Sequence, residues 1–264
     1  DNDKLIYYSM NDLTPIEQYV LIEKHLISPA LVNSKGSRGV AINSDHRISV
    51  MVNEEDHLRI QSVALGMNME KAWDLADKID NVLEESIEYA FNEKLGYLTS
   101  CPTNVGTGMR ASYMMHLPAL EWSGQLQNIL YAIGKLGIAV RGLYGEGTQA
   151  EGSLYQISNQ ITLGQSEKEI IENLNNIALQ IAEQEKQMRE QILREKKEIF
   201  KDKIYRSYGT LRYARMLTTK ETMTLLSDMK MGFDMGILNE ARPVISFYEL
   251  IMYVQPAILQ KRVG

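Results

Sequence analysis

The 264-residue sequence has few of the features that mark secreted and membrane-spanning proteins. It has a single cysteine, Cys101, so no disulfide can form within the chain. No apolar run approaches the roughly 18 residues of a membrane span, and the chain does not open with the basic and apolar regions of a secretory signal. We therefore expect a cytoplasmic protein with no membrane partner.

The chain also lacks the marks of two large classes of phosphate-binding protein. Its net charge of -6 and its pI near 5.4 argue against nonspecific binding of nucleic acid. The phosphate-loop pattern Gly-x-x-x-x-Gly-Lys-Ser/Thr is absent, so any nucleotide site must be built from other donors. A hydrophobic content of 44% is enough for a substantial core, in one large domain or in one domain with a helical appendage.

The first 165 residues alternate between helical and strand patterns. Apolar spacing predicts a helix from Ile16 to Leu26, ended by Ser28 and Pro29. Asn68 is expected to cap a second helix that runs to about residue 93. The other predicted elements are strands at 39–42, 48–52 (Ile48, Val50 and Val52 alternating with Arg47, Ser49 and Met51), 58–65, 97–99, 138–141 and 154–158, and a helix at 126–136 closed by Gly137 in a left-handed conformation.

From Ser166 onward the pattern is helical. Ser166 and Glu169 form a capping box, and apolar residues then follow at near-heptad spacing. The charge-rich stretch 183–203 is expected to be a solvated helix face, with a helix-pairing or dimer surface as the alternative. We place a domain boundary here, with a catalytic domain over 1–165 and a helical dimerisation or substrate region over 166–264.

The segment CPTNVGTGMRAS (101–112) joins a thiol, a glycine turn and a guanidinium. Gly106 and Gly108 permit positive φ and close backbone approach, so amide groups can converge on an anion while Arg110 supplies charge. Cys101 on its own is most simply a small buried hydrophobic residue. Nearby arginines would instead favour a thiolate that orients a guanidinium.

A second segment, NEEDHLR (53–59), places three acids beside Arg59. A guanidinium has a pKa above 12, so turning it into a nucleophile requires carboxylates that fix its plane and accept a proton, as Glu55 and Glu146 could do. The alternatives are a solvated acid cluster and a Mg²⁺ site. A third segment, RGLYGEG (141–147), adds Arg141; three arginines in turns could hold a triphosphate, although each alone could be a surface ion pair.

These three segments resemble the best-known motifs of the phosphagen (guanidino) kinases, over residues 15–165. The segments EKHLISP (23–29), GYLTSC (96–101), MMHLPAL (114–120) and ISNQITLG (157–164) are similar to those of the bacterial protein arginine kinase branch of that family. With the helical tail, the similarity spans essentially the whole chain.

The resemblance implies an α+β fold, with a mostly antiparallel sheet flanked by helices as in glutamine synthetase, followed by an all-helical C-terminal region. It implies transfer of the ATP γ-phosphoryl group to a guanidinium nitrogen. Glu55 and Glu146 should bind and deprotonate the guanidinium, with Cys101 against it, and no metal site is built by the chain itself. The residues that should contact ATP, which brings Mg²⁺, are His25, Arg59, Arg110, Ala111, Ser112, Tyr113, Met114, Arg141, Gly142, Leu143, Tyr144, Gly145 and Glu146.

Two departures favour protein substrates over metabolites. Metabolite-using members of the family have a histidine at the position of Met114 and a tryptophan at that of Met51. These departures argue against a small-metabolite guanidino kinase, which is kept as the alternative. The partners implied are proteins with exposed arginines, a Clp ATPase whose protease degrades the marked proteins, a small zinc-binding activator and a second copy of the chain.

Two pieces of the pattern are missing from the sequence. One is an upstream Ser-Ser-Arg-x-Arg strand with two more phosphate-binding arginines, and the other is a downstream Arg-Asp-x-x-Arg-Arg-Ala segment. Since the first residue is Asp1 and not methionine, we expect the chain to lack an N-terminal part and to be truncated at both ends. A catalytically incomplete fragment that acts as a binding or dimerisation module is the second alternative.

Overall fold

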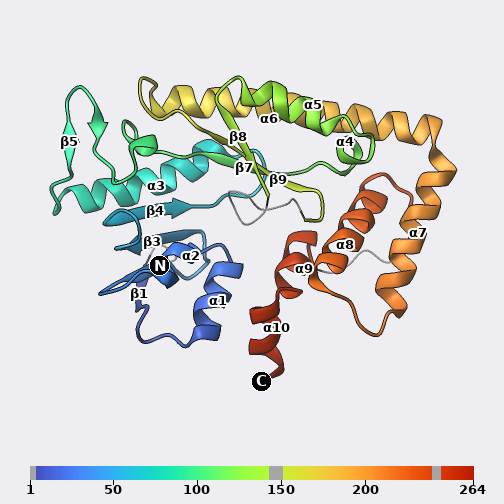
Figure 1. Ribbon diagram of the computed structural model, residues 1–264, viewed down its shortest axis with the longest axis horizontal. Coiled ribbons are helices and arrows are strands. Elements are labelled where there is room, and N and C mark those ends of the chain that lie inside the picture. Colours follow the sequence, from blue (N-terminus) through green and yellow to red (C-terminus); the bar gives the residue numbers. More distant parts are fainter. Residues whose placement is uncertain (1–3, 143–150, 240–244) are drawn as a thin grey trace. The chain divides into compact units, whose positions relative to one another are not determined.

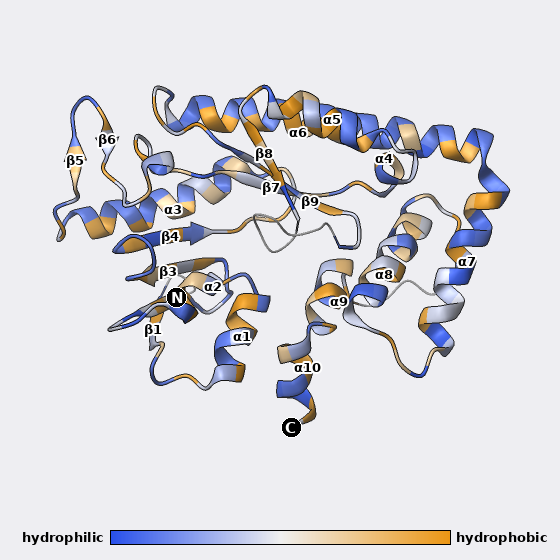
Figure 2. Ribbon diagram, in the orientation of Figure 1, coloured by the Kyte–Doolittle hydropathy of each residue, from blue (hydrophilic) through white to orange (hydrophobic). Residues whose placement is uncertain are grey.

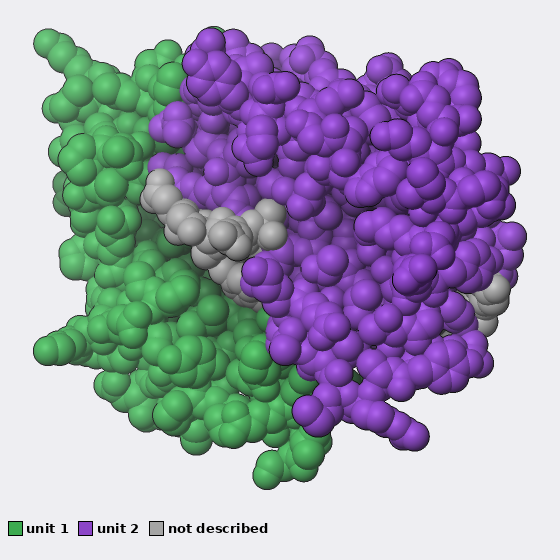
Figure 3. All heavy atoms as spheres, turned by 45° about the vertical axis from the view of Figure 1, so that its right-hand side comes forward, with its two compact units in different colours: residues 1–109, 161–171, 255–264 green, residues 110–160, 172–254 purple. Residues whose placement is uncertain are grey.

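The computed structural model describes residues 4–142, 151–239 and 245–264, and Figure 1 labels their helices and strands. The chain divides into two compact units that interleave along the sequence (Figure 3). The first unit comprises residues 1–109, 161–171 and 255–264, and the second comprises 110–160 and 172–254. Each unit is described by itself.

The first unit is built on an antiparallel sheet of order β1-β2-β3-β4. Helices α1 and α2 enclose a core with one face of this sheet, to which Met10, Leu31 and Met51 contribute. The elements of the unit are β1 (Leu5–Ser9), α1 (Pro15–Glu23), α2 (Pro29–Asn33), β2 (Gly39–Asn43), β3 (Ile48–Val52), β4 (Leu58–Ser62), α3 (Met69–Glu84), β5 (Phe91–Asn92), β6 (Gly96–Tyr97), a short 3-10 turn (Pro102–Asn104) and α10 (Pro256–Val263).

Strand β3 is buried on both faces. Ile48 and Val50 lie on one face, and Ser49 and Met51 on the other are equally inaccessible. Met51 packs in the core beneath α2, and its Sδ accepts a hydrogen bond from Ser28 N at 3.4 Å. The predicted strand is therefore confirmed, and the alternation along it separates two buried environments.

The structure confirms Asn68 as the N-cap of α3, but the predicted end of the helix was wrong. The Asn68 side chain makes no capping bond with the helix; its amide turns back and donates to Leu65 O at 2.6 Å. The helix ends at Glu84, and residues expected in its last turns form the β5–β6 hairpin. In this hairpin the Tyr97 ring stacks edge-on against Phe91 at 5.2 Å. Such aromatic pairing between strands is favourable and leaves no mark in helical periodicity.

The second unit contains an antiparallel sheet of order β7-β9-β8. Helix α6 packs on one face, where the Tyr113 hydroxyl lies 2.5 Å from Asn175 Oδ1. Leu154 on β9 instead packs against Met223 and Leu226 of α8. The elements are β7 (Ser112–His116), α4 (Pro118–Trp122), α5 (Leu126–Gly134), β8 (Ile138–Arg141), β9 (Leu154–Asn159), residues 172–195 of α6 (Glu167–Glu195), α7 (Lys197–Tyr213), α8 (Thr219–Asp234) and α9 (Phe247–Tyr253).

Two local sequence signals, a left-handed glycine and a capping box, are confirmed. Gly137 adopts the predicted left-handed conformation with φ +76°, although α5 ends earlier than expected, at Gly134 with Lys135 at its C-cap. Ser166 and Glu169 form the capping box, with Ser166 N donating to Glu169 Oε2 at 2.8 Å and Glu169 N donating to Ser166 Oγ at 3.3 Å. Figure 2 shows polar and apolar residues alternating along α6, as expected for a helix that buries one stripe.

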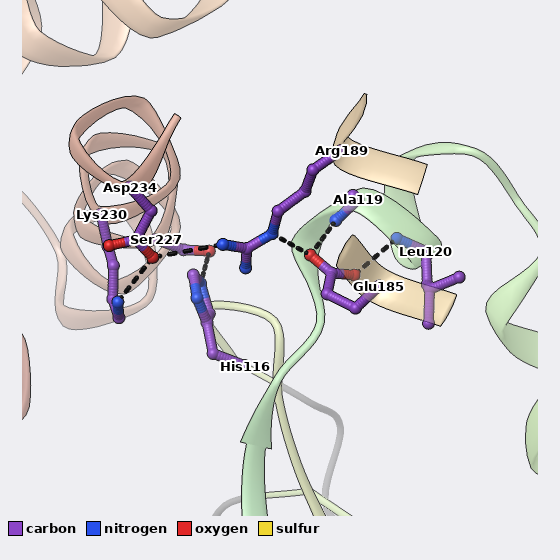
Figure 4. A network of polar contacts seen from close by, with 8 residues as sticks. All are labelled: His116, Ala119, Leu120, Glu185, Arg189, Ser227, Lys230 and Asp234. Atoms are coloured by element: carbon purple, nitrogen blue, oxygen red, sulfur yellow. Dashed lines mark hydrogen bonds and ion pairs between the residues drawn. The ribbon is translucent and has the colours of Figure 1, made fainter. Parts of the chain in front are cut away.

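The charge-rich stretch 183–203 is a solvated face only in part. The helix is interrupted at Lys196, between α6 and α7, and Glu185 is buried. The Glu185 carboxylate accepts hydrogen bonds from Ala119 N and Leu120 N, and Arg189 pairs with it at 2.7 Å (Figure 4). One acid in this stretch therefore organises the start of α4.

The structure confirms an α+β fold with mostly antiparallel sheets, followed by a helical C-terminal region. None of the described helices is long and apolar enough to cross a membrane.

Candidate active site

The three acids occupy the turn between β3 and β4, which we call the acid turn (residues 53–57). Asn53 adopts φ +58°, a conformation that asparagine tolerates better than most residues. Its N–H donates to His57 O at 3.0 Å, and Glu54 N donates to Asp56 O at 3.2 Å. The turn is thus closed by its own backbone, and its three carboxylates have different surroundings.

Glu54 is fixed inside the unit. Its side chain is 4% exposed, accepts a hydrogen bond from Ser28 Oγ at 2.5 Å, and pairs with Arg59 Nη1 at 3.3 Å. Burial opposes ionisation, but the Ser28 hydrogen bond and the Arg59 charge outweigh it, so the pKa of this carboxyl lies below its usual value. Glu54 is therefore an ionised structural carboxylate, and it holds one side of the half-exposed Arg59 guanidinium.

Asp56 ties the acid turn to the Cys101 loop, which we define as residues 100–109. Asp56 Oδ1 accepts a hydrogen bond from Ser100 N at 2.6 Å. Ser100 precedes Cys101, whose half-buried sulfur lies 3.0 Å from Thr103 Oγ1. The structure therefore brings the acid turn and the cysteine loop side by side, with Glu55 as the exposed acid between two anchored ones.

His25 follows α1 in the same unit. It adopts φ +56°, and its carbonyl oxygen accepts a hydrogen bond from Gln61 Nε2 on β4. Burial lowers the pKa of His25, so its ring is neutral at physiological pH. The first unit thus contains Glu55, Cys101, His25 and Arg59 of the predicted site.

The sheet of the second unit displays several predicted nucleotide contacts on one face. Met114 and Arg141 both pair with Gln156, on opposite sides of β9, so the three side chains form a row across the sheet. Ser112, two residues before Met114, lies on the same face, and its hydroxyl accepts a hydrogen bond from Gln156 Nε2 at 2.9 Å. Arg110 lies just before this strand and is exposed.

The side chains of two other predicted contacts in this unit, Tyr113 and Ala111, do not lie in that row. Tyr113 is buried on the opposite face of the sheet, against Asn175 of α6, so its side chain supports the sheet from behind. Ala111 is buried, its N–H donates to Asn159 Oδ1 at 2.8 Å, and its carbonyl accepts from Asn159 N. Gly142 is buried at the end of β8. Leu143, Tyr144, Gly145 and Glu146 lie outside the described residues.

Sequence reasoning missed Gln156 and Ser28. Gln156 became visible only through the register of β9 between β7 and β8. Ser28 was interpreted as the end of one helix, whereas its Oγ caps the next helix at Leu31 N and also binds Glu54. An N-cap pattern before Pro29 was the available signal.

The described residues contain no group of three or more His, Cys, Asp or Glu side chains arranged to hold a metal ion. Glu54 and Asp56 already accept hydrogen bonds from the protein.

Comparison with known proteins defines the class. Residues 1–188 match the family model of the ATP:guanido phosphotransferase C-terminal catalytic domain, and the chain belongs to this family of kinases. Two solved structures share the fold. A duplicated taurocyamine kinase from Schistosoma mansoni with bound transition state analog components aligns with a TM-score of 0.64 and 29% identity, over 70% of this chain and 27% of that one. Lombricine kinase aligns with a TM-score of 0.58 and 28% identity, over 70% of this chain and 55% of that one.

The branch of the family is defined by the C-terminal region. Residues 197–264 match the model of the protein-arginine kinase McsB C-terminal domain. Protein-arginine kinase from Caldanaerobacter subterraneus subsp. tengcongensis is 52% identical over 97% of this chain and 76% of its own length. The Bacillus subtilis protein-arginine kinase is 49% identical over 99% of this chain and 71% of its own length. The resemblance inferred from the motifs is confirmed.

Proposed function

We propose that the protein transfers the γ-phosphoryl group of ATP to the guanidinium of arginine side chains in other proteins. The observation that supports this most directly is the match of residues 197–264 to a C-terminal domain specific to protein-arginine kinases, behind a guanidino kinase catalytic domain. Relatives named protein-arginine kinase match both regions at about half identity. Met114 and Met51 stand where metabolite-using members have histidine and tryptophan, in agreement with a protein substrate.

The first unit is assigned to the substrate guanidinium. In the reaction one guanidinium nitrogen forms a bond to the γ-phosphorus, the bond from that phosphorus to the bridging oxygen of ADP breaks, and the nitrogen loses a proton. Glu55 is assigned as the acceptor of this proton because Glu54 and Asp56 are held by Ser28 and Ser100. Cys101 would lie against the guanidinium, and Glu146 would be the second carboxylate.

The second unit is assigned to ATP. Arg110 and Arg141 lie beside the face that carries Ser112, the exposed Met114 and Gln156, which suits phosphates flanked by a less polar surface for the base. Arg59 would add a third guanidinium, and His25 would contact the nucleotide. The remaining predicted contacts are Ala111, Tyr113 through its main chain, and residues 142–146. Phosphoryl transfer depends mainly on positioning and neutralisation of charge, so these groups suffice without a covalent intermediate.

Mg²⁺ is proposed to arrive as the complex with ATP, where it neutralises charge on the phosphate oxygens. The cellular parts of the proposal rest on the family resemblance. They are action in the cytoplasm, marking of proteins for a Clp protease through a Clp ATPase, a small zinc-binding activator, and a homodimer built through the helical region.

The experiment incubates the chain with Mg²⁺-ATP and an arginine-rich protein, and measures acid-labile phosphate on arginine. Glu55→Gln should lower the rate by about 100-fold or more, the usual cost of losing a general base, while ATP binding stays within about twofold. Arg110→Ala should weaken ATP binding by about tenfold or more, because a charge-assisted hydrogen bond is lost. Glu190→Gln, an exposed carboxylate on α6, is the matched control and should behave as the unchanged protein.

Phosphorylation of free arginine or creatine but not of protein would identify a metabolite kinase and reject the proposed substrate. Unchanged activity in Glu55→Gln would reject the assigned base. If the chain binds ATP and transfers no phosphate to either substrate, the kinase proposal fails for this chain and the binding-module alternative takes its place.

A further inference from the structure

The end of helix α1 places His25 in a strained position. Leu26 N donates to Leu21 O at 2.9 Å and His25 N donates to Ile22 O at 2.8 Å, which is the pair of bonds of a Schellman motif. The residue after the helix cap in this motif adopts a left-handed conformation and is usually glycine. Here it is His25, with φ +56°. A side chain at this position costs free energy and persists where the surroundings hold it.

Two contacts on the far side of His25 hold the segment in place. Gln61 of β4 donates to the His25 carbonyl oxygen. Ser28, three residues later, binds the buried Glu54 of the acid turn. Residues 25–28 therefore connect the end of α1 directly to the acid turn.

A third contact comes from the other end of the sequence. The Glu23 carboxylate, in the last turn of α1, accepts hydrogen bonds from Ala257 N and Ile258 N, both at 2.8 Å. These are N–H groups of the first turn of α10, which have no acceptor within a helix. Gln255, the residue at the N-cap of α10, supplies no side-chain cap, so Glu23 takes that role. Ala257 and Ile258 are buried, and α10 belongs to the same compact unit as α1.

This contact joins the two regions defined by the family models. Glu23 lies in the catalytic region and α10 lies in the C-terminal region. The Glu23 carboxylate joins them through two hydrogen bonds, two residues from His25. A second link, between Lys261 and Glu17 at 3.3 Å, joins exposed side chains at the opposite end of α1. An exposed ion pair of this kind contributes little.

We infer that α10 is a positioning element for the nucleotide site, acting through Glu23 to hold His25 in its left-handed conformation. The inference rests on the proposed function, because it takes His25 as a contact of ATP. The state of the C-terminal region and the affinity for ATP are then coupled. Coupling of this kind is reciprocal, so ATP binding also stabilises the docking of α10.

The first test uses variants on both sides of the contact. Glu23→Gln removes the charge and one acceptor, and Ala257→Pro removes one donor in a helical turn that tolerates proline. Each should raise the Kd and KM for ATP by roughly three- to tenfold, less than the ~100-fold that misplacement near the reacting atoms can cost. The KM for the protein substrate should stay within about twofold. The double variant should be no worse than the more affected single one, because both remove the same contact.

Lys261→Ala is the matched control, since it removes the exposed ion pair between α10 and α1, and it should leave the Kd for ATP unchanged. Equal loss of affinity for ATP and for protein substrate in the two test variants would overturn the inference, because general loosening of the fold has that effect. Unchanged ATP affinity would also overturn it.

The second test needs no substitution. Amide hydrogen exchange is measured on the unaltered chain with and without Mg²⁺-ATP, over residues 24–28 and at Ala257 and Ile258. Slower exchange in both segments is expected. Slowing over residues 24–28 with no change at 257 and 258 would overturn the inference and leave the ATP assignment intact. ATP binding that slows exchange in neither segment would reject the assignment of His25, whatever the outcome of the phosphorylation assay.

Discussion

His116 shows how burial sets the chemistry of a single residue in this protein. Its Nε2 lies 2.8 Å from Ser227 Oγ (Figure 4), and its buried Nδ1 has no hydrogen-bond partner among the residues that the structure describes. Burial, reinforced by the positive charges of Arg189 and Lys230, lowers the pKa of His116 to about 3. Arg189 is shared between Glu185 and Asp234, so the nearby carboxylates are already compensated. His116 is therefore neutral in the folded protein.

We predict that His116 makes folding sensitive to mild acid. Below the ordinary histidine pKa of 6.5 the unfolded chain binds a proton that the folded chain does not, so stability falls as the pH drops from 6.5 toward 3. Between pH 6.5 and pH 5 this residue should account for up to about 2 kcal/mol of lost stability. Urea unfolding of the unaltered chain and of His116→Gln, at both pH values, measures the difference.

The unaltered chain should lose more stability between pH 6.5 and pH 5 than His116→Gln does, because glutamine keeps a partner for Ser227 and does not titrate. Contributions from His25, His46 and the carboxyl groups are common to both and cancel. Equal losses in the two proteins would show that His116 can be protonated in the folded state.

Candidate site residues could be named from the sequence where a residue type points to one chemistry, and their roles stay predictions. The arginines and Glu55 stood out because a guanidinium reaction needs them, and the pattern around them indicated the family. Glu185 could not be found this way. It lies among the charges of 183–203, and only the fold brings it to the backbone of Ala119 and Leu120.

At the scale of elements, the Cys101 loop is held by close packing of backbones. Tyr97 N donates to Gly106 O at 2.8 Å, and Thr107 N donates to Thr162 O at 3.0 Å. Thr162 Oγ1 in turn donates to Thr103 O and Val105 O. The loop is thus fixed between the β6 strand and the segment after β9, which sets the position of Cys101.

Two glycines in this loop allow a matched prediction. A Cβ on Gly106, which has φ +114°, would lie 2.2 Å from Thr162 O, whereas a Cβ on Gly108, which has φ +61°, meets nothing closer than 3.8 Å. Gly108→Ala should cost about 1 kcal/mol from its left-handed backbone. Gly106→Ala should cost about 2 kcal/mol more, because backbone atoms must also move.

Chemical unfolding of both variants measures these costs, and the phosphorylation assay shows whether Cys101 has moved. Equal destabilisation by the two substitutions would contradict the packing described for Gly106. The sequence motif permits positive φ at both glycines, and it could not distinguish them because the atoms that crowd Gly106 belong to Thr162 and Leu163, more than fifty positions away.

Elements were predictable from sequence where local rules decide them. The strands β2, β3 and β8 and the capping box at Ser166 follow from alternation and side-chain capping. The end of α3 did not follow, since the β5–β6 hairpin depends on aromatic contacts between strands. The conformation of His25 was also hidden, because a histidine stands where the pattern calls for glycine.

At the scale of the whole molecule, the compact units do not follow the order of the sequence. The second unit takes strands from the catalytic region and helices from the C-terminal region. Leu154 on β9 is 1% exposed and packs against Met223, Leu226 and Ile251, which come from α8 and α9. The domain boundary expected near residue 165 stays a prediction. The second compact unit is defined by a core to which the catalytic and the C-terminal regions both contribute.

Leu154→Ala should therefore destabilise the strands and the helices of the second unit together. Removing a buried leucine side chain costs about 2–5 kcal/mol, and the cavity would open beside Met223 and Leu226. Amide hydrogen exchange should become faster in α8 and α9 as well as in β9, while β2 and β3 of the first unit keep their protection. Leu31→Ala, a buried leucine of the first unit, is the matched control and should show the opposite pattern. Faster exchange confined to β9 would mean that the helical region folds on its own core, and faster exchange throughout the chain would mean that the two units unfold as one.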